Sequence, residues 1–146
     1  MEKNNNLLEE IHLQFPAEET DIRNYAPLKL AYLGDAVYEI ILRTIVIEHM
    51  GGPVKKLHTR TSSLVNAGAQ SKFVGAMMDS LTEEEEAVFR RGRNAKASSV
   101  AKHADIHDYR NATGLEALFG YLYLKGELSR AVELLRNAME QLDIVI

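Results

Sequence analysis

Apolar side chains recur at helical spacing along most of the chain and predict a protein built from helices. The longest such segment begins near Pro27 and continues to about Met50, and the sequence Gly-Gly-Pro at 51–53 then breaks it. Its regularly spaced apolar residues are Leu30, Leu33, Val37, Ile40, Ile41 and Ile45. Polar residues are sparse here, so the pattern favours a largely buried helix.

The same periodicity predicts shorter helices on both sides of this segment. They cover residues 1–15, 53–65, 73–78, 82–91, 113–124 and 129–142. Thr82 and Glu85 form the signature of a capping box, which marks a helix start. Residues 66–69 are expected to form a turn or weak point, and residues 95–108 a loop with a short helix. We find no convincing strand pattern, repeat or linker, so we expect an all-α fold with one domain over residues 1–146.

Composition narrows the class of protein. The 146 residues are 46% hydrophobic and 26% charged, as in an ordinary globular domain. There are no cysteines, which excludes disulfides and cysteine-based zinc sites. The polar amino terminus lacks the apolar core of a signal peptide, and Arg43 interrupts the longest apolar run, at 40–47. We therefore expect a cytoplasmic protein.

Charge is distributed unevenly along the chain. The net charge of −4 argues against a general nucleic-acid binder. Residues 90–110 nevertheless hold six Lys or Arg and two Asp, a local excess of four positive charges, so the rest carries −8. Any contact with an anionic polymer is therefore expected in this segment.

Gly34 and Asp35 are unusual in the middle of a buried helix. A glycine there destabilises the helix by roughly 1 kcal/mol relative to alanine, which suggests that another backbone or a ligand comes close. An aspartate between apolar residues needs a cation, a hydrogen-bond donor or an open cleft. On its own, Asp35 is better explained as a carboxylate that caps a neighbouring helix, so the case for chemistry depends on a second carboxylate.

Glu116 is a second acid near the start of a mostly apolar helix, and Gly120 follows one turn later. A close approach of the two helices at Gly34 and Gly120 would bring Asp35 and Glu116 together. Two carboxylates in a low-dielectric site repel each other, and a divalent cation relieves that repulsion. All-oxygen ligands favour Mg²⁺ or Mn²⁺, which can activate water for attack on a phosphodiester.

Two segments carry a resemblance to a known family. Leu-Gly-Asp-Ala-Val at 33–37 and Glu-Ala-Leu-Phe-Gly-Tyr-Leu-Tyr-Leu at 116–124 resemble the signature segments of the ribonuclease III catalytic domain. Residues 57–65, with Arg60 among them, resemble the helix that follows the first signature. No length is left for a double-stranded RNA-binding domain. This absence, together with Leu-Ala-Tyr-Leu-Gly-Asp at 30–35 and Ala-Thr-Gly-Leu-Glu-Ala-Leu at 112–118, resembles the Mini-III ribonucleases most closely.

This resemblance implies a homodimeric, Mg²⁺-dependent endoribonuclease that cleaves double-stranded RNA and matures precursor large-subunit (23S) ribosomal RNA. It assigns catalysis and metal binding to Asp35 and Glu116. Typical ribonuclease III enzymes carry two further acids where this chain has Ala31 and Thr113, so the larger acidic cluster does not carry over. Thr113 is a candidate to orient a water beside the metal, and Glu39 is expected to form a structural salt bridge, with a second-shell role as the alternative.

Basic residues ahead of the Glu116 helix are candidates for contact with RNA phosphates, which supply most of the affinity for nucleic acid. The candidates are Arg60, Arg90, Arg91, Arg93, Lys96 and Lys102. An ordinary solvated charge run is the alternative. Because A-form RNA is recognised mainly through its backbone and 2′-hydroxyls, little sequence specificity is expected.

Two other functions stay open. A His-Asp metal phosphohydrolase would use His107 and Asp108 with His49 or His58, but a two-residue motif often arises by chance. The polar cluster of His103, Asp105, His107 and Asp108 is better explained as loop surface. A non-catalytic RNA-binding or assembly module could also keep the fold and lose the chemistry, although retention of both acids argues against it.

Overall fold

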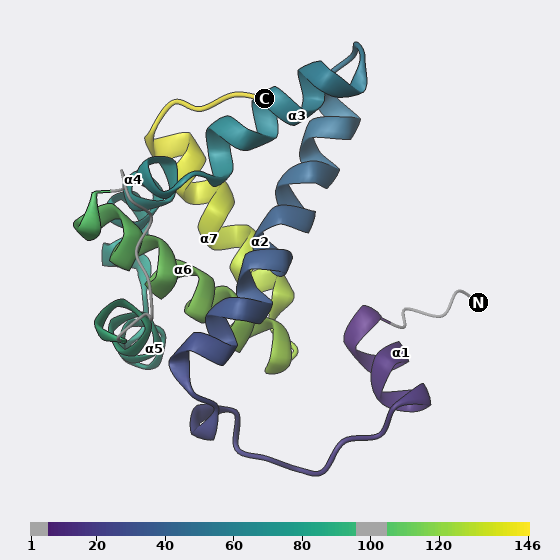
Figure 1. The fold of residues 1–146 in the computed structure, drawn as a ribbon, viewed down its shortest axis with the longest axis vertical. Helices are drawn as coiled ribbons and strands as arrows, with labels where there is room; N and C mark the ends of the chain where they lie inside the picture. Colours follow the sequence, from purple (N-terminus) through teal and green to yellow (C-terminus); the bar gives the residue numbers. More distant parts are fainter. Residues whose placement is uncertain (1–5, 96–104) are drawn as a thin grey trace.

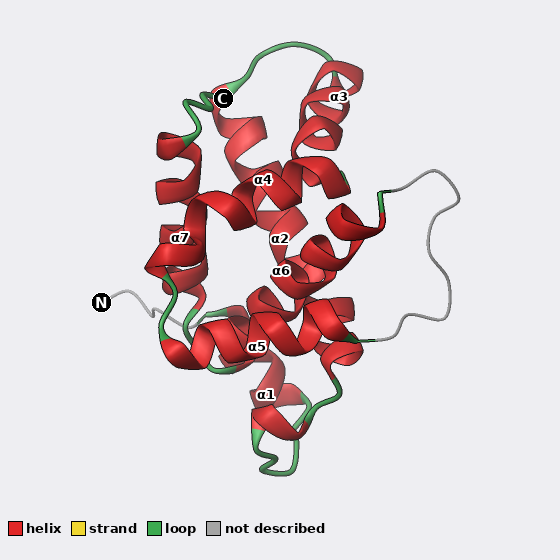
Figure 2. Cartoon of the chain, turned by 90° about the vertical axis from the view of Figure 1, so that its left-hand side faces the viewer, coloured by secondary structure: helices red, strands yellow, loops and turns green. Residues whose placement is uncertain are grey.

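The computed structural model describes residues 6–95 and 105–146, and all regular structure within them is helical (Figures 1 and 2). The α-helices are α1 (Leu7–Gln14), α2 (Pro27–His49), α3 (Val54–Val65), α4 (Ala67–Met77), α5 (Glu83–Asn94), α6 (Ile106–Leu124) and α7 (Leu128–Gln141). Two single 3₁₀ turns cover Ile22–Asn24 and Met78–Ser80. The all-α class expected from the sequence is confirmed.

Helix α6 lies at the centre of the fold and packs against α2, α4, α5 and α7 (Figure 1). Its fully buried residues include Leu115, Leu118, Phe119 and Leu122. From α2, the buried ring of Tyr38 lies edge-on against Phe119, with 5.5 Å between ring centroids. By contrast, α1 has no buried residue and lies to one side of the other helices (Figure 1).

The α2 and α6 backbones touch at two glycines. A Cβ atom on Gly34 would overlap the main-chain carbonyl oxygen of Glu116, and one on Gly120 would overlap that of Leu30. Only glycine permits this separation, because any side chain would push the two helices apart. The close approach predicted from the sequence is therefore present, and it sets the distance between everything that the two helices carry.

Helix boundaries show where local sequence signals were sufficient. The capping box is present: Thr82 and Glu85 exchange hydrogen bonds of 2.9 and 3.1 Å, and α5 extends to Asn94. At the predicted weak point, Asn66 ends α3 and caps α4 by accepting a 2.9 Å bond from the Ala69 amide. The turn is thus a single residue.

The start of α6 was predicted wrongly. The helix begins at Ile106, seven residues before the predicted start at Thr113, because the Asp105 carboxylate accepts bonds from the amides of His107 (2.8 Å) and Asp108 (3.2 Å). Its first turn combines the exposed Ile106 and His107 with the half-buried Asp108 and Tyr109, so apolar periodicity does not reveal it.

Within the described ranges, no helix has the length and apolar character needed to cross a membrane.

Candidate active site

The contact between α2 and α6 brings Asp35 and Glu116 together. Asp35 is exposed on α2, whereas Glu116 is half-buried on α6. Burial is the main cause that raises the pKa of the Glu116 carboxyl, to about 8, and the neighbouring charge of Asp35 and a hydrogen bond with it raise it further. The solvent-exposed carboxylate of Asp35 thus lies beside the half-buried carboxyl of Glu116, which resists ionisation.

A buried amide completes this arrangement. The Gln70 side chain on α4 is 2% exposed, and its Nε2 donates to Oε2 of Glu116 at 3.4 Å. This bond acts against the other effects by lowering the pKa of Glu116. Gln70 was not predicted as a site residue, although one signal existed: it precedes Phe73 and Val74 by three and four residues, on the apolar face of its helix.

Tyr38 lies beside the same pair but belongs to the core. Its hydroxyl donates a 2.9 Å bond to the main-chain oxygen of Leu64, and burial together with the charge of Glu116 raises its pKa above the ordinary value. A phenol held in this way remains protonated and fixes α2 to the end of α3.

The Asp35–Glu116 pair is better explained as a binding site for a divalent cation than as two carboxylates without a cation. Without a cation, deprotonation of Glu116 would place two negative charges side by side next to a protein interior. Mg²⁺ is commonly bound by one or two carboxylates, with water and substrate phosphates as its other ligands. Because Asp35 is exposed, water and a phosphate can reach this point.

Other metal-binding arrangements receive no support. In the part of the chain that the structure describes, no group of three or more His, Asp or Glu side chains could hold a metal. His49 and His58 line separate hollows, and His107 lies 3.2 Å from the Asn111 amide nitrogen. His103 lies outside the described residues. The His-Asp phosphohydrolase interpretation therefore lacks a site here.

Thr113 and Glu39 both interact within their own helices. The Thr113 hydroxyl is buried and donates a 3.0 Å bond to the carbonyl oxygen of Tyr109, one turn earlier. Glu39 forms the salt bridge expected from the sequence, with Arg43 at 2.9 Å.

The candidate RNA-binding arginines on α5 are exposed or half-buried, and two also contact the protein. Arg90 pairs with Glu86 on the same helix at 2.7 Å. Arg91 donates to the main-chain oxygens of Arg23 (3.1 Å) and Tyr25 (3.5 Å), which holds the segment before α2 against α5. Arg93 is half-buried near the end of α5.

The remaining basic candidates lie elsewhere. Arg60 on α3 donates a 2.8 Å bond to the main-chain oxygen of Val145, near the carboxyl terminus. Lys96 and Lys102 lie outside the described residues.

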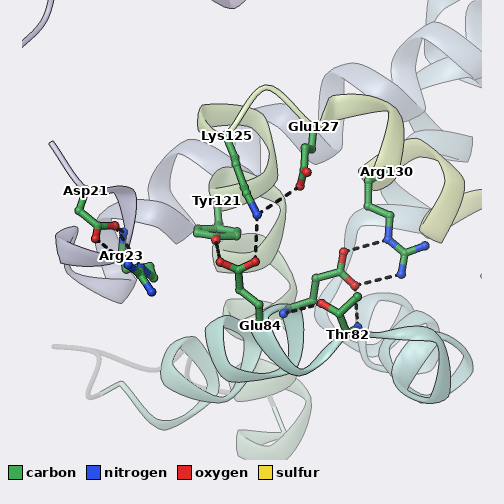
Figure 3. A network of polar contacts seen from close by, with 9 residues as sticks. Asp21, Arg23, Thr82, Glu84, Tyr121, Lys125, Glu127 and Arg130 are labelled. Carbon is green, nitrogen blue, oxygen red and sulfur yellow. Dashed lines mark hydrogen bonds and ion pairs between the residues drawn. The ribbon is translucent and has the colours of Figure 1, made fainter. Parts of the chain in front are cut away.

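A second acidic group, at the start of α5, is neutralised by the protein itself (Figure 3). Two nitrogens of the Arg130 guanidinium lie 2.8 and 2.9 Å from the two carboxylate oxygens of Glu85. The neighbouring Glu84 accepts bonds from the Tyr121 hydroxyl and from Lys125 (Figure 3). Each of these acids already has a partner from the chain, Glu84 in Tyr121 and Lys125 and Glu85 in Arg130, so we interpret the network as structural.

Comparison with known proteins places the chain among related sequences. A family profile described as "Ribonuclease III domain" matches residues 28–127, which include Asp35 and Glu116. A protein named "Mini-ribonuclease 3" from Clostridium tetani is 49% identical over 117 residues, covering 80% of this chain and 78% of the relative. Its namesake from a Thermoanaerobacter species is 41% identical over 122 residues, covering 84% and 86% of the two chains.

A solved structure is similar to this chain in both fold and sequence. The crystal structure of a protein from Fusobacterium nucleatum aligns with a TM-score of 0.73 at 28% sequence identity. The alignment covers 84% of this chain and 98% of the other.

Proposed function

Because this chain belongs to the ribonuclease III domain family and is an endoribonuclease of that type, we propose that it cleaves double-stranded RNA with Asp35 and Glu116 as its catalytic, metal-binding residues. The observation that carries the proposal is the contact of α2 and α6 at Gly34 and Gly120, which sets these two acids against each other. A helical protein has no structural need for such a pair, and a metal site does.

Asp35 and Glu116 differ in exposure to solvent, and we assign them different roles on that basis. Asp35 and Glu116 would hold Mg²⁺, for which Mn²⁺ could substitute, and the bound cation would supply a water of lowered pKa and neutralise charge on the phosphate. Asp35, on the solvated side, faces the incoming RNA backbone, whereas Glu116 holds its carboxylate behind it in contact with Gln70. Ala31 and Thr113 add no charge, so further ligands must come from water and the RNA phosphate.

We propose that the basic residues on and after α5 contact the RNA backbone. Arg90, Arg91 and Arg93 lie near the carboxyl end of α5. Helix α5 packs against α6, the helix that carries Glu116. Lys96 and Lys102 extend the same basic segment, and Arg60 on α3 is a further candidate. Backbone contacts of this kind bind duplex RNA with little regard to sequence.

The finer biological assignment rests on the family resemblance. We propose that the natural substrate is precursor 23S ribosomal RNA and that the enzyme acts in the bacterial cytoplasm. The bacterial origin of the related "Mini-ribonuclease 3" proteins is consistent with this assignment.

We propose that the active form is a homodimer that uses the exposed face of α2. Large apolar side chains recur there at helical spacing, and Tyr32 is 85% exposed, Ile40 59% and Ile47 66%. Large exposed apolar side chains on a helix are typical of an interface, and here they share the face with the polar residues Asp35 and Arg43. Two catalytic sites related by a two-fold axis would cut both strands of a duplex, which is itself nearly two-fold symmetric.

A non-catalytic RNA-binding module is the competing function, and cleavage separates the two. Purified protein is incubated with long double-stranded RNA, with Mg²⁺ or with EDTA, and the products are resolved on a gel. We expect cleavage only with Mg²⁺. Asp35→Asn and Glu116→Gln should each lower the rate by roughly 10³-fold or more, because transition-state stabilisation worth several kcal/mol is lost.

The matched control is Glu140→Gln, which removes an exposed acid on α7 that pairs with Arg136 at 3.2 Å. This variant should cleave normally. Sedimentation and melting curves establish that the inactive variants are still folded. Near-normal turnover by either Asp35→Asn or Glu116→Gln would refute the metal-site assignment, and binding without cleavage by the unaltered protein would favour the RNA-binding module.

A further inference from the structure

The Glu116 carboxylate has few polar neighbours besides Asp35. The nearby Tyr38 hydroxyl donates to the carbonyl oxygen of Leu64. Among the described residues, Gln70 supplies the one amide donor to this carboxylate, at 3.4 Å from Oε2. Its position therefore bears directly on how Glu116 is oriented.

Gln70 is held in place by the junction of α3 and α4. Asn66 caps α4 through the Ala69 amide, and its own amide donates back to the main-chain oxygens of Ser62 (3.2 Å) and Ser63 (3.3 Å). Gln70 lies in the first turn of the helix fixed in this way and is 2% exposed. A buried amide without a partner is costly, so its direction towards Glu116 is well defined.

We propose that Gln70 is a positioning residue that holds the Glu116 carboxylate in its metal-binding orientation, an inference that rests on the proposed function of Glu116. The side chain suits this task because its amide is neutral. An arginine or lysine at position 70 would neutralise the acidic pair and compete with the cation. An apolar residue would leave Glu116 free to rotate and to share a proton with Asp35. Partners that orient ligands in this way typically contribute on the order of 10–100-fold in metal affinity or activity.

The test compares Gln70→Met with the neighbouring control Ser71→Ala. Methionine keeps the length and volume of glutamine but cannot donate, whereas Ser71 contacts Asn111 at 3.0 Å rather than Glu116. Mn²⁺ binding to the RNA-free protein is measured by electron paramagnetic resonance, alongside the melting temperature and RNA cleavage as a function of Mg²⁺.

We expect Gln70→Met to weaken Mn²⁺ binding and raise the Mg²⁺ midpoint of cleavage by on the order of 10–100-fold. Most of kcat should return at saturating Mg²⁺, and the metal-free melting temperature should change little. Ser71→Ala should leave the metal midpoint unchanged. A merely structural role would instead lower the melting temperature without moving the metal titration.

The two proposals fail in different ways. Should Glu116→Gln abolish Mn²⁺ binding while Gln70→Met binds normally, the positioning role of Gln70 is wrong and the metal site stands. Should Glu116→Gln also bind Mn²⁺ normally, the proposed function of Glu116 is wrong. Gln70→Ala is the second variant, and failure of both variants to fold would make Gln70 a residue of the core and refute the inference.

Discussion

Glu85 and Glu116 are carboxylates shielded by the same helical core, and their surroundings are opposite. Glu85 is 5% exposed and meets a guanidinium on both oxygens, and hydrogen bonds from Arg130 are the main cause that lowers its pKa. Glu116 is half-buried beside another carboxylate, and burial and Asp35 raise its pKa to about 8. Glu85 is ionised and paired with a cation from the chain, whereas Glu116 lies beside a second carboxylate and keeps its proton until about pH 8.

This difference separates a structural acid from a functional one. A buried carboxylate is tolerated when a cation pairs with it and fixed hydrogen bonds satisfy its oxygens, as Arg130 does for Glu85. Glu116 receives one amide bond, from Gln70, and no cationic side chain is recorded within ion-pair distance in the described ranges. An external cation is the simplest partner for it. Four measurements test the comparison, from the largest expected effect to the smallest.

Breaking the ion pair between Arg130 and Glu85 should have the largest effect on stability. Arg130→Met leaves Glu85 buried without its cation and also removes the bond to the Ser80 carbonyl oxygen. We expect the free energy of unfolding to fall by about 2–4 kcal/mol, since the pair is mostly shielded from water. Chemical denaturation measures this loss. RNA cleavage at low temperature should remain, and a stable but inactive Arg130→Met protein would contradict the division of roles.

Adding a divalent cation should stabilise the folded protein through Glu116 and not through Glu85. Mn²⁺ at ten times its dissociation constant should raise the free energy of unfolding by about 1.4 kcal/mol through binding to Asp35 and Glu116. The same titration of Glu116→Gln should show no stabilisation, whereas Arg130→Met should respond like the unaltered protein. Thermal melting with and without EDTA detects the shift. Equal stabilisation of Glu116→Gln would place the cation elsewhere.

The two acids should give opposite pH dependences. The folded protein retains a proton on Glu116 from pH 4.5, its ordinary pKa, to about 8, whereas the unfolded chain loses it. Metal-free stability should therefore fall as pH rises from 6 to 8.5, by a few degrees of melting temperature. Glu85, whose pKa is lowered, contributes stability that is lost only as pH falls below its ordinary value.

Glu116→Gln is the control for this pH profile, because it removes the titrating group and keeps the shape of the side chain. Its melting temperature in EDTA should be flatter between pH 6 and 8.5. A profile with the same slope in both proteins would assign the titration to a different group.

The smallest expected effect concerns the arginine side chains and the salt dependence of RNA binding. Arg130 is committed to Glu85, whereas Arg93 has no recorded acidic partner in the described part of the chain and Arg90 pairs only at the surface. In Arg90→Ala and Arg93→Ala, each lost phosphate contact should flatten the log–log salt dependence of RNA binding by roughly 0.7–0.9. Arg136→Ala on α7 is the matched control, and an unchanged slope in the α5 variants would place the RNA elsewhere.

Much of the fold was accessible from local signals. The Thr82–Glu85 capping box and the apolar spacing of residues 27–50 depend on neighbours within one helix, so the sequence alone determined those elements. Two helical glycines, Gly34 directly before Asp35 and Gly120 one turn after Glu116, also predicted the approach of α2 to α6. The start of α6 escaped prediction because the Asp105 cap precedes a polar turn without apolar periodicity.

Tertiary structure alone decided the other contacts between polar groups of different helices. Gln70 and Glu116 are 46 residues apart in sequence, and Arg60 and Val145 are 85 apart. Whether an amide is buried, or an arginine is held by a distant carbonyl, depends on how the helices pack, which no local pattern encodes. In the sequence, Glu85 lies between Glu84 and Glu86, and Glu116 lies between Leu115 and Ala117. Only the packed helices place the guanidinium of Arg130 against Glu85, because charge balance is a property of neighbours in space.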